Sequence, residues 1–439
     1  MDGFPYAFIV VFKRMRPGIL AFLLFNLAIS AAPAQQYQPK TITFTGYKDA
    51  SSEELEQVAA LHLGTPVTQE DIRAAAEKLN ATGLFASVNF QADNTGVHFA
   101  LTPAEILVPV GFENFPWWDE KEIINQMHAR VPLFHGTLPP TSTLQQQVTD
   151  ALVALVATKG VTATVEGTQQ EEIETGKLAA IRFRILAPSI TVGAVTYTGV
   201  GSSNAGDIEP IALAATGQDY SSLSTPATLS QAIRIVYHNK GYLDESTAGF
   251  TTKEPVVQDG KVVVPISMTI NEGPQYRLGT ITLAGDVLMG NEDFQKRSLL
   301  HPGDIAQEDK LRNTLYIVAQ PYRAKGYLRS RISADATHHP GPPPTVDYAI
   351  RVTPGDPFHM GKLTLEGFND AQKEEFLAAW TMNAGDAFDA TYPPSFLKAN
   401  AAKLHSMDDY SATYKQTEHE DTHAVDLVVT LRKGGPVSK

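Results

Sequence analysis

The chain has 439 residues, of which 43% are hydrophobic and 19% are charged, and its formal net charge is −13. This length exceeds one ordinary domain and this composition is globular rather than disordered, so several domains with separate cores are expected. The acidic balance disfavours nucleic acid as a partner, because phosphate binding needs clustered Lys and Arg. The sequence has no cysteine, which excludes disulfides, thiolate catalysis, cysteine-bound zinc and iron–sulfur clusters.

The first 34 residues have the pattern of a secretory signal peptide. A basic cluster at residues 13–16 precedes an apolar run at residues 19–29, and small residues at 32–34 favour cleavage after Ala34. The run is shorter than the ~20 residues of a membrane-spanning helix, although an uncleaved anchor remains an alternative. Translation could also start at Met15, and the precursor would then never have carried the apolar residues that precede the basic cluster. Cleavage would leave a soluble, exported chain of net charge −15.

The predicted elements of the first unit follow the order strand, helix, helix, strand, strand. Ser51 and Thr68 are suitable helix N-caps, and apolar residues recur behind each of them at helical spacing. The elements are a strand at 42–46, helices at 52–63 and 69–82, and a hairpin of strands at 87–92 and 97–101. The unit should therefore pair two helices with one small sheet.

Four further units repeat this order, which divides the chain after the signal peptide into segments 35–103, 104–188, 189–274, 275–355 and 356–439. The strands that open the last three segments end at Gly199, Gly285 and Gly367, which recur at nearly equal spacing. Lys-Gly-Tyr-Leu follows the second helix at residues 240–243 and again at 325–328. Glycine suits this place because it accepts the left-handed conformation that ends many helices.

Two of the five units are divergent copies. The second keeps the glycine at Gly160 but has no tyrosine after it, and in the fifth unit residues 407–410 stand where the glycine is expected. The fifth unit opens at residues 363–367, has a helix at 373–381 and closes with a strand at 424–431.

Residues 262–285 show how one unit is joined to the next. Val262 begins a run of alternating apolar residues that predicts a strand with one buried face, and Glu272-Gly273-Pro274 ends it. The alternation resumes at Ile281, so one unit closes and another opens. Pro265 lies inside the first strand, where its missing N–H predicts a bulge or a late strand start.

The element order, the Gly-ended first strand, the Lys-Gly-Tyr stop and the Glu-Gly-Pro joint resemble the POTRA domains of the outer-membrane assembly family that includes BamA and TamA. The resemblance covers nearly all of residues 40–433. It implies an α+β fold, a tandem array of about five βααββ domains, each with two helices packed on a three-stranded mixed sheet. It also implies a location in the periplasm of a Gram-negative-type envelope, peripheral to the outer membrane. Family members continue into a transmembrane β-barrel, for which this chain is expected to have no room.

The resemblance implies a non-enzymatic scaffold or chaperone-like module without a cofactor. Its expected partners are unfolded or partner outer-membrane polypeptides, with a separate β-barrel protein as a further candidate. Such domains bind extended polypeptide by adding it to an exposed sheet edge, and the resemblance makes the middle strand of each unit that edge. An edge that simply stays solvated is the alternative for any one strand. The candidate binding residues are Val88, Phe90, Thr162, Thr164, Phe250, Thr252, Arg331, Ile332, Thr413 and Lys415.

Several sequence patterns resemble catalytic or metal sites but are better explained by structural roles. Residues 419–423 match H-E-x-x-H, the signature of a metal-dependent hydrolase, yet their place between two strands predicts a hairpin loop instead of the required helix. His338-His339 precede a proline-rich loop and are expected to be solvated. Trp117-Trp118 could form a contact surface or a staple under the first helix of the second unit, and we expect one ring to be packed and the other to be partly exposed. No catalytic, cofactor-binding or metal-binding residue is predicted, and a purely structural envelope spacer is a second alternative to the scaffold.

Overall fold

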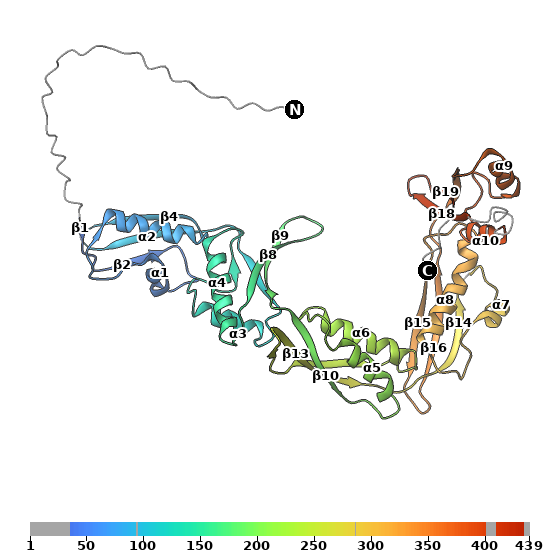
Figure 1. Cartoon of the computed structure of the whole chain (residues 1–439), viewed down its shortest axis with the longest axis horizontal. Helices are drawn as coiled ribbons and strands as arrows, with labels where there is room; N and C mark the ends of the chain where they lie inside the picture. Colours follow the sequence, from blue (N-terminus) through green and yellow to red (C-terminus); the bar gives the residue numbers. More distant parts are fainter. Residues whose placement is uncertain (1–35, 94, 286, 401–409, 434–439) are drawn as a thin grey trace, which may run out of the picture. The chain divides into compact units, whose positions relative to one another are not determined.

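The computed structural model describes residues 36–93, 95–285, 287–400 and 410–433 (Figure 1). These residues form two compact units. Unit 1 holds the described residues up to Pro109 together with Met127–Val148, and unit 2 holds Val110–Gln126 and the described residues from Thr149 onward. The predicted signal peptide lies outside the described residues. Among the described helices, none combines the length and hydropathy needed to span a bilayer.

The elements fall into five successive sets, called repeats 1 to 5, of which the first three carry additional short strands. Repeat 1 consists of β1 (Gln36–Tyr37), β2 (Ile42–Thr45), α1 (Ser52–Ala59), β3 (Val67–Thr68), α2 (Gln69–Ala81), β4 (Phe85–Ala92) and β5 (Val97–Pro103). Repeat 2 consists of β6 (Val108–Glu113), α3 (Glu120–His128), β7 (Thr137–Leu138), α4 (Thr143–Ala157), β8 (Thr164–Glu171) and β9 (Leu178–Ala187). Repeat 2 contributes residues to both units.

Repeats 3 to 5 all belong to unit 2 and share the order strand, helix, helix, strand, strand, with the short strand β12 added in repeat 3. Repeat 3 consists of β10 (Ile190–Thr198), α5 (Ala205–Ala215), α6 (Thr225–His238), β11 (Ser246–Thr252), β12 (Val256–Gln258) and β13 (Lys261–Asn271). Repeat 4 consists of β14 (Arg277–Ala284), α7 (Asn291–Arg297), α8 (Glu308–Arg323), β15 (Arg331–His339) and β16 (Thr345–Thr353). Repeat 5 consists of β17 (His359–Glu366), α9 (Asp370–Ala379), α10 (Tyr392–Ala399), β18 (Tyr410–His419) and β19 (Ala424–Lys433). The prediction of an α+β array of tandem βααββ units is confirmed.

The last strand of each repeat lies inside its sheet. The strand orders are β2-β5-β4, β7-β6-β9-β8, β10-β13-β11 with β12 also on β13, β14-β16-β15 and β17-β19-β18. The first strand of each repeat runs parallel to this inner strand, and the middle strand runs antiparallel to it. A parallel pair needs a crossover connection, which the two helices provide. The middle strand is therefore left at an edge of the sheet.

The buried face of β13 matches the predicted alternation. Val262, Val264, Ile266, Met268 and Ile270 are each at most 3% exposed, whereas the residues between them are half-buried or exposed. The helices of repeat 3 cover this face, because α5 packs on β10 and α6 on β11 (Figure 1). Repeats 3, 4 and 5 each have a separate hydrophobic cluster of this kind. The prediction of separate cores is confirmed for these repeats.

The first two helices begin where their caps predicted. Ser51 and Thr68 each close a capping box, with the side chain of the N3 acid bonded back to the cap backbone. The predicted length of the first helix is wrong, because Ala60 takes the left-handed conformation with φ 55° and α1 ends at Ala59. Leu61 is buried although it lies in the non-helical segment that follows. Apolar spacing cannot separate a helix from an extended segment that fills the same core.

Repeat 5 differs from its predicted elements at one helix. The structure adds α10, and the Pro at its first turn is suited to a helix start. The residues at 407–409 that were expected to end a helix lie outside the described residues, and Tyr410 already belongs to β18. The final strand is present as β19.

The irregularity predicted at Pro265 is a bulge. The strand β13 begins at Lys261, ahead of the proline, so the start is not late. The register instead shifts in the two neighbours, between Val192 and Val195 of β10 and between Ala248 and Thr251 of β11. Repeats 4 and 5 have the corresponding shift in β14 and β17. There, Asp347 and Asp426 accept the freed N–H groups of Thr280 and Lys362, so the bulge belongs to the repeat and Pro265 occupies a position that tolerates it.

A second recurring contact was not predicted from the sequence. In repeats 3, 4 and 5 the residue near the start of the first strand forms an antiparallel bridge with a residue in the loop between the helices. The pairs are Thr191 with Asp219, Arg277 with Ile305, and His359 with Ala387, at the same sequence separation in each case. Repeats 1 and 2 have two-residue ladders at the same place, β1 with β3 and β6 with β7. The bridge fixes the helix pair to the edge of the sheet opposite the middle strand.

Candidate functional site

The middle strands β4, β8, β11, β15 and β18 carry nearly all of the candidate binding residues. Nine of the ten predicted residues lie within these strands, and Thr162 precedes β8 by two residues. Each of these strands ends its sheet in the strand order. The structure thus places the middle strands at the sheet edges. The binding role of the ten residues stays a prediction.

The five edges differ in regularity. In β4, β8 and β11 the register against the inner strand shifts at one or two points. In β15 and β18 it runs without interruption through nine and ten pairs. An uninterrupted edge offers a longer row of backbone donors and acceptors to an added strand. On this criterion β15 and β18 are the strongest candidates, and every residue of β15 is described together with its side chain.

The exposed face of β15 is polar and charged. Arg351 of the inner strand pairs with Asp335, and His339 pairs with Asp347 at 2.9 Å. Ile332 and Ala334 are half-buried and pack toward the core of repeat 4. Charged side chains on a long edge discourage self-association, and they leave the backbone of the edge accessible to an extended polypeptide.

An open groove of about 410 Å³ lies beside the end of β11. Its lining includes Trp117 and Trp118 from repeat 2 and Phe250 from β11. Both tryptophans are half-buried, so the partial exposure expected for one ring is observed for both; the rings lie 5.5 Å apart, with the ammonium of Lys159 5.6 Å from the centroid of Trp118. The two tryptophans and Phe250 of β11 line the same groove.

The Lys-Gly-Tyr-Leu segments join successive repeats as well as ending helices. The carbonyl oxygens of Gly241 and Gly326 each accept the N–H of a residue in the next repeat, Tyr276 and Phe358, at 2.8 Å. The leucines that follow, Leu243 and Leu328, pack against the hydrophobic clusters of repeats 4 and 5. The leucine at the same position of both segments is the sequence signal for this role.

The carboxylate of Glu272, in the Glu-Gly-Pro joint, forms hydrogen bonds to three residues of repeat 3. Its carboxylate accepts the N–H of Gly201 at 2.9 Å, the amide of Asn204 at 3.0 Å and the hydroxyl of Tyr237 at 2.7 Å. Burial by itself would raise the pKa of Glu272, but the hydrogen bonds from Asn204, Tyr237 and Gly201 and the charge of Lys240 lower it. The carboxylate is therefore ionised near neutral pH and holds the opening loop of α5 against α6.

Polar pairs also cross the joint between repeats 3 and 4, both in unit 2. The ring of His238 on α6 lies 2.7 Å from a carboxylate oxygen of Glu308 on α8. The carboxylate of Asp244 accepts the hydroxyl of Tyr276 at 2.6 Å and lies 2.9 Å from His338. Burial, followed by the bond to Asp244, raises the pKa of Tyr276 to about 12. This joint is held by hydrogen bonds in addition to Leu243.

The H-E-x-x-H residues lie at the tip of a hairpin, as predicted. His419 ends β18, the next four residues form the turn, and β19 begins at Ala424. His419 lies 3.2 Å from Asp426, whereas His423 lies 3.7 Å from Asp356 and Glu420 pairs with Arg329. In the described part of the chain these histidines do not share a ligand group. The geometry of a zinc hydrolase is not formed here.

The two histidines ahead of the proline-rich loop are exposed, as expected, but they belong to a strand. His338 and His339 are the last two residues of β15 and lie in its ladder with β16. Each lies beside a carboxylate, His338 beside Asp244 and His339 beside Asp347. The strand extends further than the loop composition suggested, because β16 begins directly after the prolines.

Comparisons with known proteins give distant relatives. A candidate outer membrane protein assembly factor of Treponema pallidum (strain Nichols) is 23% identical over 158 residues, which are 36% of this chain and 19% of that protein. The outer membrane protein assembly factor BamA of Neisseria meningitidis serogroup B is 23% identical over 141 residues, 31% of this chain and 17% of that protein. These matches span less than a fifth of the length of either relative. No protein-family model matches the chain.

Among solved structures, POTRA domains 3–5 of Haemophilus influenzae BamA are 15% identical with a TM-score of 0.41, covering 56% of this chain and 100% of that one. POTRA domains 1–3 of Omp85 from Anabaena are 11% identical with a TM-score of 0.23, covering 56% of this chain and 97% of that one. The chain resembles POTRA-domain proteins of outer-membrane assembly. The five sets of elements are accordingly called POTRA-like repeats from here on.

Proposed function

We propose that the chain is a non-enzymatic scaffold that binds unfolded or partner outer-membrane polypeptides by β-augmentation of its POTRA-like repeats. The observation that carries the proposal is β15, a nine-residue strand paired without interruption on one side and placed last in its sheet. An added strand gains affinity from main-chain hydrogen bonds and some selectivity from alternate side chains. The distant similarity to named assembly factors supports the choice of outer-membrane polypeptides as the bound class.

The proposal places the protein in the periplasm of a Gram-negative-type envelope, peripheral to the outer membrane. It rests on the signal-peptide pattern of residues 1–34 and on the resemblance to POTRA domains. A separate β-barrel protein is a further proposed partner. The hydrolase alternative has no support in the described residues, because the turn at 419–423 separates the two histidines from a common centre.

The edge should contact substrate directly. A photo-crosslinking amino acid at Arg331 or Thr337 of β15 is expected to label a urea-unfolded outer-membrane protein that is diluted into the purified chain. Both positions are exposed, so the label should not disturb the core. The matched control is Tyr316 on α8 of the same repeat, which is 64% exposed but lies on a helix. We expect at least tenfold stronger labelling from the edge, measured on denaturing gels.

Equal labelling at Tyr316 would show that contact with the polypeptide is not directed by the edge. No labelling from β15, or from Thr413 and Lys415 of β18, would contradict β-augmentation and favour the spacer alternative. Folding of each labelled chain is checked by circular dichroism, so that a lost signal is not attributed to an unfolded protein.

A further inference from the structure

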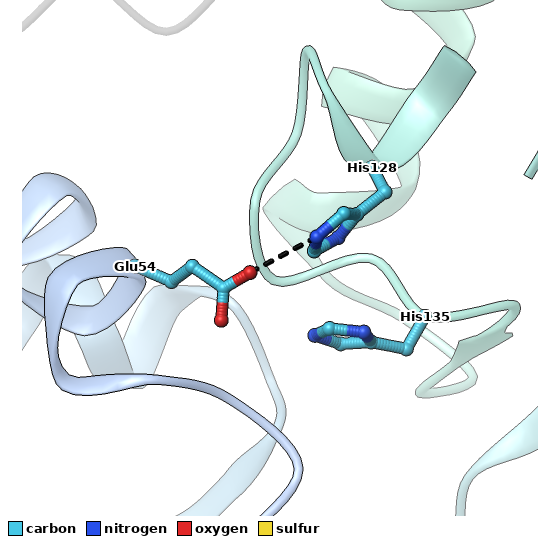
Figure 2. Close-up of side chains that lie close together, drawn as sticks. All are labelled: Glu54, His128 and His135. Atoms are coloured by element: carbon cyan, nitrogen blue, oxygen red, sulfur yellow. Dashed lines mark ion pairs between the residues drawn. The ribbon is translucent and has the colours of Figure 1, made fainter. Parts of the chain in front are cut away.

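Three side chains of unit 1 that can bind a metal lie close together, although the sequence analysis predicted no metal site. Glu54 lies in the first turn of α1, His128 is the last residue of α3, and His135 follows shortly after it. One ligand atom from each lies within 4.8 Å of the other two. Figure 2 shows the carboxylate of Glu54 directed at the ring of His128, with the ring of His135 beside both. We propose that these three residues bind a divalent transition-metal ion of the zinc type.

The carboxylate of Glu54 is already held in position. One of its oxygens, Oε2, accepts the N–H of Ser51 at 2.7 Å and the hydroxyl of Ser51 at 3.0 Å, which closes the capping box of α1. The other oxygen, Oε1, remains on the side of the histidines and lies 3.0 Å from Nε2 of His128. Burial alone would raise the pKa of Glu54, but the hydrogen bonds from Ser51 and the two histidine rings lower it. An ionised ligand is therefore available at neutral pH.

The orientation of His128 is that of a metal ligand. Its Nδ1 lies 3.3 Å from the carbonyl oxygen of Phe134, and since a carbonyl can only accept, Nδ1 carries the proton. In a neutral ring Nε2 then has a lone pair, and this lone pair faces the Glu54 carboxylate. Two acceptors at 3.0 Å repel each other unless a proton on the ring or a metal cation neutralises the contact. Metal-bound histidines commonly donate their second ring N–H to a backbone carbonyl in this way.

His135 supplies the third ligand. Its ring centroid lies 4.6 Å from that of His128. Burial, and after it the neighbouring His128, lowers the pKa of His135, and one of its ring nitrogens lies within 4.8 Å of the ligand atoms of Glu54 and His128. Two imidazoles and one carboxylate suit zinc better than calcium or magnesium, which prefer oxygen ligands.

The distance between Glu54 and His128 is already that of two ligands of one ion, and the three ligand atoms lie within 4.8 Å of one another. Bonds of ~2.0 Å to nitrogen and oxygen at a tetrahedral angle place two ligand atoms about 3.3 Å apart, close to the 3.0 Å between Glu54 and His128. Three protein ligands leave a fourth position for water or for a group of another molecule. A bound ion would tie the start of α1 to the end of α3, two segments that are distant in the sequence but belong to a single unit.

The test uses the full mature chain after treatment with EDTA. Isothermal titration with Zn²⁺ is expected to show one site of micromolar or tighter affinity that raises the melting temperature. Titration with Co²⁺ should give the visible absorption of a tetrahedral ion. The variant Glu54→Gln is expected to weaken Zn²⁺ binding at least tenfold while keeping the fold, because glutamine also completes a capping box. His128→Gln and His135→Gln should do the same.

The matched control is His62→Gln, which changes an exposed histidine of repeat 1 outside the cluster, and it should leave the Zn²⁺ affinity unchanged. His338→Gln controls for binding at the histidine–carboxylate pair that crosses the joint between repeats 3 and 4. Absence of Zn²⁺ and Co²⁺ binding by the wild-type chain would overturn the proposal. Binding that survives Glu54→Gln and both histidine variants within twofold would also overturn it. These measurements are independent of polypeptide binding by the edge strands.

Discussion

Gly326→Ala is expected to loosen the joint between repeats 4 and 5. Gly326 has φ 85°, and a Cβ built on it overlaps the carbonyl oxygen of Phe358. The side chain would therefore add the strain of a left-handed residue and would also push away the strand start to which Gly326 is bonded. The left-handed strain alone costs of order 1 kcal/mol, and the displaced backbone should bring the total to about 3 kcal/mol. Native-state hydrogen exchange should show faster opening of the Phe358 amide.

Gly303→Ala separates these two contributions. Gly303 also has a left-handed backbone, with φ 90°, but no heavy atom lies within 4 Å of a Cβ built on it. This variant should lose only the stability that corresponds to the strain of a left-handed residue, about 1 kcal/mol. If both variants lower the stability of their surroundings equally, the close approach to Phe358 has no energetic weight and the proposed role of Gly326 in the joint is wrong.

Glu272→Ala should destabilise repeat 3 by about 3 kcal/mol, because an unsatisfied buried polar group costs about 1–3 kcal/mol. The change leaves the hydroxyl of Tyr237 and the amide of Asn204 without their acceptor, and these two residues are 0% and 3% exposed. Hydrogen exchange of α6 and β13 in the full chain would measure the loss. In the background of Tyr237→Phe the same change should cost about 1 kcal/mol less, because the hydroxyl is then already absent.

The effect of Glu272→Ala depends on pH in a defined direction. In the unfolded chain this carboxyl titrates near its ordinary value of 4.5, and in the folded chain the hydrogen bonds of Asn204 and Tyr237 lower its pKa. The carboxylate therefore contributes its full stabilisation above pH 4.5, and this contribution is lost as the pH falls through the lower folded value. Wild-type and variant chains should differ most near neutral pH and converge in acid. A difference that grows below pH 4.5 would contradict this assignment.

The repeated architecture could be predicted because its main signals are local. The alternation beginning at Val262 specifies one buried face of a strand, and Ser51 and Thr68 cap helices through residues three positions away. The break at Glu272-Gly273-Pro274 marked the joint for the same reason. The edge position of each middle strand then followed from the resemblance and agrees with the observed strand order.

The features that were missed depend on contacts between distant residues. After the end of α1, Leu61 enters the core from a non-helical segment whose apolar pattern also fits a helix. The bridge between Arg277 and Ile305 leaves no signal in the amino-acid sequence, because it is made by backbone groups. Glu54 and His128 belong to different repeats and match no ligand spacing in the sequence. Only the three-dimensional arrangement brings them together.

The leucines of the Lys-Gly-Tyr-Leu segments determine which residues a single repeat needs when it is duplicated in evolution or expressed as a fragment. Leu328 precedes the elements of repeat 5 in the chain yet fills part of that repeat's core. A fragment that begins at β17, the first strand of repeat 5, or a gene duplication with a breakpoint there, would lack Leu328 and produce a domain with a hole in its interior. A complete module is therefore one sheet with its helices plus the turn that ends the second helix of the preceding repeat. A truncation that keeps this turn begins ahead of residue 325 and also carries β15 and β16 of repeat 4.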